Sequence, residues 1–207
     1  MSEVLVPDQP AMTPIEIDCF KRVLANCRSF VEYGSGGSTL FALKAGVAEV
    51  FSVECDPAWA DAVLLGVRSA GYDAAQVVSV NIGKTGKWGY PVDWKGNVWT
   101  RRQRTLYAMR PWRSGLLGLA KSDRKPDVVL IDGRYRVACV AATALNTPPQ
   151  TIVMIHDFWD RGREYYEPVL TLLEPVEKAG TLGVFRRTDA SIDVAKQILA
   201  AHRNDPR

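Results

Sequence analysis

The segment Phe30-Val31-Glu32-Tyr33-Gly34-Ser35-Gly36-Gly37-Ser38 decides the fold. Its first four residues are typical of a short strand that ends at a glycine-rich turn, and Ser38 can cap a helix that continues to about Ala45. Glycines in such a turn let the backbone approach a ligand, and the N-terminus of the following helix offers free N–H groups. The segment therefore predicts an α/β unit with a ligand site at its turn.

Strand and helix patterns alternate on both sides of this segment. Residues 128–131, Val-Val-Leu-Ile, are apolar on both faces, as a central parallel strand must be. The stretches 174–178 and 182–187 flank Ala179-Gly180-Thr181 closely enough to predict an antiparallel hairpin at the end of an otherwise parallel sheet. We expect further strands at 49–54, 76–82, 127–132 and 151–157, and helices at 13–26, 56–70, 136–145, 163–173 and 192–202.

The composition suits one globular domain spanning residues 1–207. Of the 207 residues, 47% are hydrophobic and 24% are charged, which argues against a disordered or fibrous chain. The apolar runs are far shorter than the ~20 residues needed to cross a bilayer, and residues 1–10 lack the pattern of a secretion signal. The four cysteines are widely spaced and lie in apolar stretches, as reduced core thiols do. We expect a cytoplasmic protein without membrane contact.

Residues 83–125 form an insertion that is longer than a usual connection between strands. Residues 84–125 hold 11 Lys/Arg and 2 Asp/Glu, a net charge of +9, whereas the whole chain is only +3. The insertion also contains Trp88, Trp94, Trp99 and Trp112. Three interpretations remain open: a lid over an anionic small substrate, an interface of a homodimer, or a nucleic-acid surface, which the modest overall charge disfavours.

The glycine turn does not match the common nucleotide-binding fingerprints. The dinucleotide pattern G-x-G-x-x-G/A would require Gly or Ala where Thr39 stands, and a G-x-x-x-x-G-K-[ST] phosphate loop is absent. An acidic residue, Glu32, comes two positions before Gly34, and a second acidic residue, Glu54, ends the next predicted strand. Carboxylates at these places repel a pyrophosphate and attract a cation.

Glu32-Tyr33-Gly34-Ser35-Gly36 and Glu54 resemble the first motifs of the class I S-adenosylmethionine-dependent methyltransferases. The resemblance extends over about residues 30–187. It implies a three-layer, Rossmann-like α/β fold with a seven-strand sheet, mostly parallel, that ends in an antiparallel hairpin. It also implies that Glu32 organises the methionine end of the cofactor and that Glu54 accepts both ribose hydroxyls. The cofactor-binding set implied by the resemblance is Glu32, Gly34, Ser35, Gly36, Ser38, Glu54, Asn81 and Ile82.

Two later segments, residues 131–135 (Ile-Asp-Gly-Arg-Tyr) and 155–158 (Ile-His-Asp-Phe), resemble the I-D-G and H-D motifs of one methyltransferase subgroup. Both follow predicted parallel strands, on the edge where open α/β sheets bind ligands. The resemblance implies that Asp132, His156 and Asp157 are the catalytic residues, with Asp132 or His156 as base. Related enzymes hold magnesium with carboxylates here, but His156 replaces one acidic residue, so a divalent metal at Asp132 and Asp157 stays open.

These observations predict an S-adenosylmethionine-dependent methyltransferase that acts on a small, anionic acceptor at oxygen. Fold alone does not decide function. A metal-dependent hydroxylase or oxidoreductase on the same scaffold, and a cofactor-binding protein without catalysis, remain alternatives.

Overall fold

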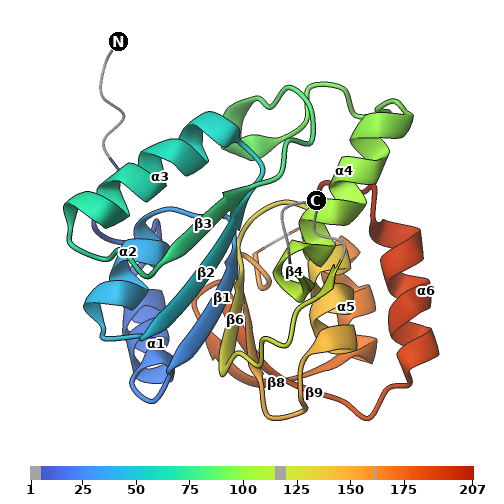
Figure 1. Ribbon diagram of the computed structural model, residues 1–207. Helices are drawn as coiled ribbons and strands as arrows, with labels where there is room; N and C mark the ends of the chain where they lie inside the picture. Colours follow the sequence, from blue (N-terminus) through green and yellow to red (C-terminus); the bar gives the residue numbers. More distant parts are fainter. Residues whose placement is uncertain (1–5, 115–119, 161) are drawn as a thin grey trace.

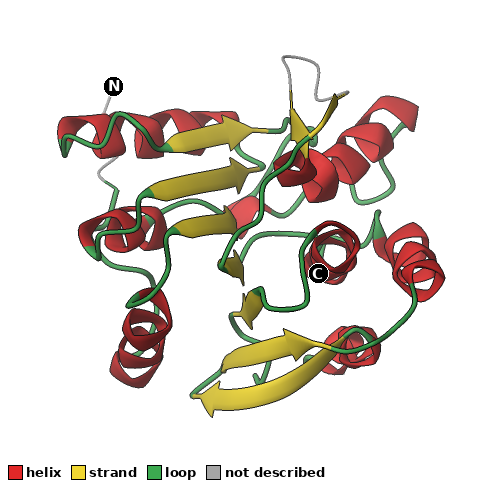
Figure 2. Ribbon diagram, turned by 60° about the horizontal axis from the view of Figure 1, so that its bottom comes forward, coloured by secondary structure: helices red, strands yellow, loops and turns green. Residues whose placement is uncertain are grey.

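The computed structural model describes residues 6–114, 120–160 and 162–207. The expectation about residues 1–10 therefore falls partly outside the described residues. The central feature is a seven-stranded sheet with the spatial order β3-β2-β1-β6-β7-β9-β8 (Figures 1 and 2). Its strands are β1 (Ser29–Tyr33), β2 (Glu49–Glu54), β3 (Gln76–Ser79), β6 (Val128–Ile131), β7 (Ile152–Ile155), β8 (Leu173–Ala179) and β9 (Leu182–Arg187).

The first five strands of the sheet pair in parallel, whereas β9 runs antiparallel to both β7 and β8. In Figure 2 the β8–β9 hairpin forms one edge of the sheet and β3 the other. The predicted mostly parallel sheet with a terminal antiparallel hairpin is confirmed. All four residues of β6 are buried, as their apolar run predicted for a central strand.

Helices cover both faces of the sheet and complete three layers (Figure 1). One face carries α1 (Pro14–Leu24), α2 (Gly37–Lys44) and α3 (Pro57–Ser69), and the other carries α4 (Val98–Met109), α5 (Arg136–Asn146) and α6 (Ile192–His202). Alternate strand residues supply the two apolar cores. Val31 and Val129 belong to the core under α5, and Phe30 and Leu130 belong to the core under α1 and α2.

The insertion is partly built into the fold. It contains η1 (Lys87–Gly89), α4, η2 (Arg110–Trp112) and the short antiparallel pair β4 (Arg113–Ser114) and β5 (Ala120–Lys121). The Tyr33 hydroxyl donates to the Ala108 carbonyl at 2.6 Å and accepts from the Trp112 indole at 3.0 Å. Trp112 is thus a core residue, whereas Trp88, Trp94 and Trp99 are exposed. Residues 115–119 of the predicted insertion lie outside the described residues.

Two predicted elements differ from the structure. The third strand ends at Ser79 instead of residue 82, because its partner β2 ends at Glu54, which pairs with Ser79. The helix expected at 163–173 is the 3₁₀ helix η3 (Glu164–Thr171), which contains Pro168. Proline has no N–H for the helical ladder and clashes with the preceding turn, so an α-helix is disfavoured there.

The four cysteines are free and buried, as expected for core thiols. Among the helices of the described residues, none has the length and apolar character that a membrane crossing requires.

Candidate functional site

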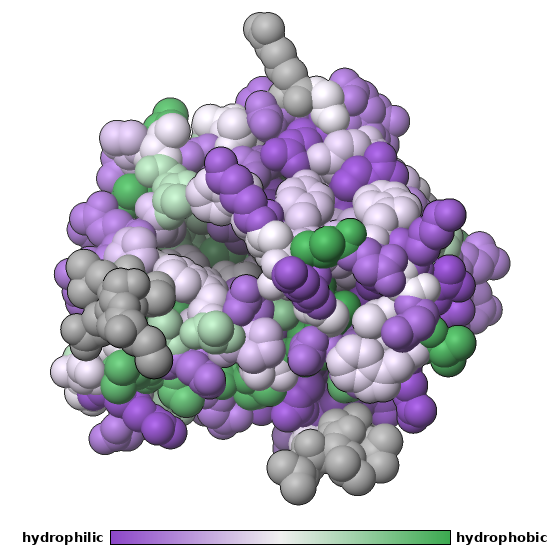
Figure 3. All heavy atoms as spheres, turned by 90° about the horizontal axis from the view of Figure 1, so that it is seen from above, coloured by the Kyte–Doolittle hydropathy of each residue, from purple (hydrophilic) through white to green (hydrophobic). Residues whose placement is uncertain are grey.

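The predicted site residues gather at the carboxyl edge of the parallel strands. The glycine turn follows β1, Glu54 ends β2, Asp132 follows β6, and His156 with Asp157 follow β7. Figure 3 looks onto this edge and shows a hollow near its centre, with polar side chains around the rim. Open α/β sheets bind their ligands at this edge.

The two glycines of the turn have different roles. Gly34 has φ +90°, and a Cβ there would lie 2.7 Å from the Gly133 backbone nitrogen, so its loop packs directly on the loop after β6. A Cβ on Gly36 would meet only the Trp59 ring, at 3.8 Å, and therefore has free space beside it. Gly34 is needed for the fold, whereas Gly36 leaves room for a ligand.

Glu32 holds the turn in place from below. Its carboxylate is fully buried and accepts hydrogen bonds from the Ser38, Thr39 and Ser52 hydroxyls. Burial raises its pKa to about 7, although the three hydroxyls act in the opposite direction. Glu32 thus fixes the start of α2. It would act on a ligand only indirectly, by holding the glycine turn in place.

Glu54 is 6% exposed and its carboxylate is already engaged by the chain. Oε1 accepts from the backbone N–H groups of Cys55 and Asp56, and Oε2 accepts from the Ser35 N–H at 3.0 Å and the Ser35 hydroxyl at 3.4 Å. The Ser35 hydroxyl makes the longest of these contacts. A ribose hydroxyl would therefore take the place of the Ser35 hydroxyl on Oε2, and acceptance of two ribose hydroxyls stays a prediction.

The two cofactor-binding residues predicted at the end of the third strand, Asn81 and Ile82, differ in exposure. Ile82 is 1% exposed and belongs to the core below α5. Asn81 is exposed, and its side-chain oxygen accepts from the Gly83 N–H at 2.9 Å. Their roles as cofactor contacts also stay predictions.

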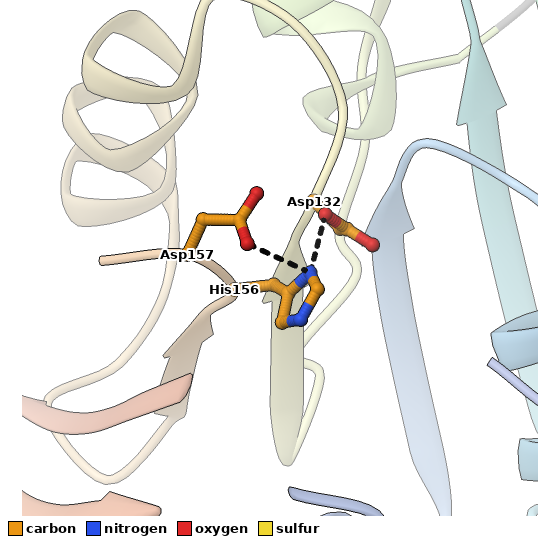
Figure 4. Close-up of side chains that lie close together, drawn as sticks. All are labelled: Asp132, His156 and Asp157. Atoms are coloured by element: carbon orange, nitrogen blue, oxygen red, sulfur yellow. Dashed lines mark hydrogen bonds and ion pairs between the residues drawn. The ribbon is translucent and has the colours of Figure 1, made fainter. Parts of the chain in front are cut away.

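Asp132, His156 and Asp157 form one cluster (Figure 4). His156 Nδ1 lies 3.0 Å from Asp132 Oδ1 and 3.8 Å from Asp157 Oδ1. The side chain of His156 is 11% exposed, whereas those of Asp132 and Asp157 are 29% and 28% exposed. The carboxylates face the solvent side of the cluster, and the imidazole lies beneath them.

Arg136, at the start of the helix that follows Asp132, places a buried positive charge in this cluster, a role that the sequence analysis missed. Its guanidinium lies 3.2 Å from Asp132 Oδ1 and 3.4 Å from Asp157 Oδ2. It also donates to the Gly133, Asp132 and His156 carbonyls and is 2% exposed. These carbonyls fix the guanidinium between the two carboxylates.

The positions of Arg136 and Arg163 decide whether a divalent metal ion fits between Asp132 and Asp157. The ligand atoms of Asp132, His156 and Asp157 all lie within 4.8 Å of one another, a spacing that suits a metal ion. However, two guanidinium groups already contact these carboxylates: Arg136 lies 3.2 Å from Asp132 and 3.4 Å from Asp157, and Arg163 lies 3.6 Å from Asp157. A divalent ion would be a third cation beside them, so the residues present do not fit one.

Electrostatics tie Asp132 and His156 into a charged pair. Burial would raise the pKa of Asp132, but the His156 hydrogen bond and the Arg136 charge hold it below its usual range. Burial would lower the pKa of His156, but the hydrogen bond to Asp132 and its charge raise it. The imidazolium is thereby favoured next to the ionised carboxylate.

Glu16 of α1 lies on the other side of the His156 ring, a contact that the sequence analysis did not predict. Glu16 Oε2 lies 3.8 Å from His156 Nε2. The carboxylate accepts from the N–H and hydroxyl groups of both Thr13 and Thr181, and these bonds outweigh burial and lower its pKa to about 2. The imidazole is thus held between Asp132 and a second carboxylate.

One oxygen of Asp132 is available to a ligand. The hydrogen bonds of the Asp132 side chain to His156 and Arg136 both use Oδ1, and Oδ2 makes no hydrogen bond within the described residues. Figure 4 shows this second oxygen directed away from His156. Asp157, within the cluster, and Tyr135, beside it, have φ +58°. Non-glycine residues rarely adopt this conformation, and those that do are often near functional sites.

The fold recurs in solved structures. A methyltransferase-like protein from Silicibacter pomeroyi is 29% identical, with a TM-score of 0.80, and the match covers 97% of this chain and 100% of that chain. The chain has the fold of the class I S-adenosylmethionine-dependent methyltransferases.

Two more distant solved structures match as well. A Staphylococcus aureus protein, provisionally described as a caffeoyl-CoA O-methyltransferase, is 11% identical with a TM-score of 0.58, covering 87% of each chain. TrmN from Thermus thermophilus is 10% identical with a TM-score of 0.54, covering 86% of this chain and 50% of its own. No protein-family model matches the sequence, and no curated protein matches it.

Proposed function

We propose that the chain is an S-adenosylmethionine-dependent methyltransferase that acts at an oxygen atom of a small, anionic acceptor. The observation that carries the proposal is the free Oδ2 of Asp132, which faces the carboxyl edge next to the Gly34–Gly133 contact in a methyltransferase fold. A carboxylate oxygen in this position accepts a proton from an acceptor hydroxyl.

The glycine turn and β2 would hold the cofactor. Gly36 leaves free space beside Trp59, and Glu54 Oε2 exchanges its Ser35 hydroxyl for a ribose hydroxyl. Bound S-adenosylmethionine supplies an electrophilic methyl group on a sulfonium with a good leaving group. The protein then contributes mainly alignment of the acceptor and removal of its proton.

Within the cluster, Asp132 is the base and His156 is its positioning residue. His156 Nδ1 is hydrogen-bonded to Asp132, its Nε2 faces Glu16 at 3.8 Å, and its side chain is only 11% exposed, so it is less accessible to an acceptor than Asp132. It orients the Asp132 carboxylate, and its positive charge stabilises the ionised form. Asp157 balances the charge of Arg136.

The basic insertion supports an anionic acceptor. A cleft of about 530 Å³ lies between α4 and the end of α6, and its lining includes Arg101, Arg102, Arg113 and Arg203. Three residues after Arg203, the Pro206 carbonyl accepts from the Tyr135 N–H, so the cleft lies near the loop that carries Asp132. Arginines concentrated in this way attract anionic molecules.

The test is transfer of a labelled methyl group from S-adenosylmethionine to a panel of small hydroxy acids, phosphorylated alcohols and amines. Wild-type protein is expected to label at least one of them, and Asp132→Asn is expected to label none while keeping its affinity for S-adenosylhomocysteine. Equal labelling by both proteins would remove Asp132 from catalysis. Labelling of amines alone would contradict the oxygen acceptor.

A further inference from the structure

A buried arginine whose Nε and Nη1 atoms have no hydrogen-bond partner among the described residues lies two residues after Asp132. This residue, Arg134, is 7% exposed, and its Nε and Nη1 atoms are inaccessible to solvent. Its guanidinium lies 4.1 Å above the Tyr90 ring. An arginine stays charged at any physiological pH, and a buried charge is costly unless it is paired. The site is therefore incomplete as it stands.

Two tyrosine hydroxyls nearby are also unpaired. The hydroxyls of Tyr107 and Tyr135 are buried and lack hydrogen-bond partners among the described residues, and the two rings lie 6.0 Å apart. The Tyr107 hydroxyl lies 2.2 Å from the place that a Cβ on Gly133 would occupy, so it contacts the loop between Asp132 and Arg134. Burial raises the pKa of both tyrosines, which keeps their hydroxyls protonated as donors.

The carboxylates close to this cluster make no hydrogen bond to it among the described residues. Glu54 accepts four hydrogen bonds from Ser35, Cys55 and Asp56, and Oδ1 of Asp132 accepts from His156 and Arg136, whereas Oδ2 of Asp132 is the proposed base. The unpaired groups are thus a guanidinium and two hydroxyls, all of them hydrogen-bond donors. A set of donors with a net positive charge matches a carboxylate or a phosphate.

A short hairpin covers Arg134. Residues 84–92, called here the 84–92 hairpin, are joined by the Gly86 N–H to Tyr90 carbonyl bond at 2.7 Å and the Val92 N–H to Lys84 carbonyl bond at 2.8 Å. A Cβ on Gly89 would lie 2.9 Å from Cys55 Sγ and 3.7 Å from Arg134 Cγ, so the hairpin packs on both side chains. This hairpin would have to move for an anion to reach Nε and Nη1, which are inaccessible to solvent.

We propose that Arg134, Tyr107 and Tyr135 form a receptor for the carboxylate or phosphate group of the methyl acceptor, covered by the 84–92 hairpin. The assignment to the acceptor rests on the proposed methyltransferase function. The anion site itself does not, because its groups are unpaired whatever the reaction. Held there, an acceptor lies next to the Asp132 loop, two residues from the base.

The first test compares thermal unfolding of wild type, Arg134→Met and Arg68→Met, an exposed arginine on α3, with and without inorganic phosphate or acetate. At an anion concentration about ten times the dissociation constant, the wild-type and Arg68→Met midpoints should rise by about 3–5 °C. The Arg134→Met midpoint should not rise, and without anion it should be no lower than that of wild type.

Two outcomes of this experiment would contradict the anion site. Equal anion-dependent shifts in wild type and Arg134→Met, or no shift in wild type, would overturn the proposal. If Arg134→Met does not fold, Tyr107→Phe and Tyr135→Phe remove single donors, and each should weaken anion binding about fivefold. Unchanged anion binding in both Phe variants also overturns it.

A second test separates an acceptor anion from the carboxylate of the cofactor. Calorimetry of Arg134→Met without added anion should give wild-type affinity, within about twofold, for S-adenosylhomocysteine and for 5′-methylthioadenosine, which lacks the carboxylate. A loss confined to S-adenosylhomocysteine would assign Arg134 to the cofactor and overturn the acceptor assignment. Failure of wild type to bind either nucleoside would refute the proposed function but leave the anion shift as a separate result.

Discussion

The Asp132 carboxylate and the His156 imidazole share a hydrogen bond of 3.0 Å that joins the ends of β6 and β7. The bond engages one oxygen of Asp132 and leaves the other free among the described residues. It also raises the pKa of His156 and helps to lower that of Asp132. The pair is therefore both a structural link between two strands and the proposed proton acceptor with its positioning residue.

The first prediction concerns the protonation of His156. Its pKa should lie above the usual value of about 6.5, and Asp132→Asn should lower it, because burial and Arg136 then act without the opposing carboxylate. Below pH ~6.5 the Asp132–His156 pair should contribute to the free energy of unfolding. This contribution should fall as the pH rises through the raised pKa of His156. It should also be lost in acid, where Asp132 becomes protonated. Proton NMR titration in a His202→Gln background leaves one imidazole to follow. A His156 pKa that is unchanged by Asp132→Asn would contradict the pairing.

A second prediction separates the two carboxylates. Asp132→Asn should reduce methyl transfer by a factor of ~10²–10⁴, the range for loss of a general base, while cofactor affinity stays within a few fold. Asp157→Asn, the matched control, should lose much less because Asp157 pairs with Arg136 and Arg163 and has no role as base. EDTA should leave wild-type turnover unchanged, since Arg136 provides the positive charge between the carboxylates. Loss of turnover with EDTA and its recovery with Mg²⁺ would contradict that assignment.

The fully buried Glu32 gives a third prediction, about stability and pH. Its folded pKa of about 7 is raised above the unfolded value, so the folded state binds the proton more tightly and stability should fall between pH ~4.5 and pH ~7. A shift of this size corresponds to about 3 kcal/mol. Urea unfolding of wild type and Glu32→Gln across this range should show that Gln removes this decline. Parallel pH curves for the two proteins would show that Glu32 is not protonated in this way.

The glycine turn allows a prediction with a matched control. Gly34 and Gly46 both have φ +90°, but a Cβ would clash with the Gly133 backbone at Gly34 and would meet nothing within 4 Å at Gly46. Gly46→Ala therefore measures the backbone cost alone, about 1 kcal/mol. Gly34→Ala should lower the free energy of unfolding by a further 1–3 kcal/mol or so, because the two loops must separate. Equal losses in both variants would mean that the Gly34–Gly133 packing contributes little.

The sequence predicted the fold well where a pattern is local. The apolar run of β6, the hairpin around Gly180 and the helix 192–202 were predicted correctly because hydrophobic period and turn residues report on neighbours in the chain. The helix expected at 163–173 became a 3₁₀ helix around Pro168, which the periodicity did not reveal. In the insertion, Trp112 is buried and Trp88 is exposed, and nothing in their spacing distinguishes them.

The site was predictable only in part. Asp132, His156 and Asp157 follow strands whose ends must lie together, so their clustering follows from the sheet order. Glu16 enters the cluster through contacts between segments far apart in the chain, such as Glu16 with Thr181, and no sequence period encodes such contacts. The signal for Arg136 was its position at the start of the helix that follows the Asp132 loop.

Cofactor binding at the glycine turn is the central claim, and calorimetry with S-adenosylhomocysteine on wild type, Gly36→Val and Gly66→Ala tests it most directly. Gly36 has extended backbone and free space, so Gly36→Val should fold normally and yet fill the place of the ligand. Gly66 lies within α3, where alanine makes ordinary contacts, and Gly66→Ala serves as the control. The account predicts binding by wild type and Gly66→Ala and a loss of at least about tenfold in Gly36→Val, on the order of 1.4 kcal/mol. Absence of binding by wild type, or equal affinity in Gly36→Val, would contradict the claim.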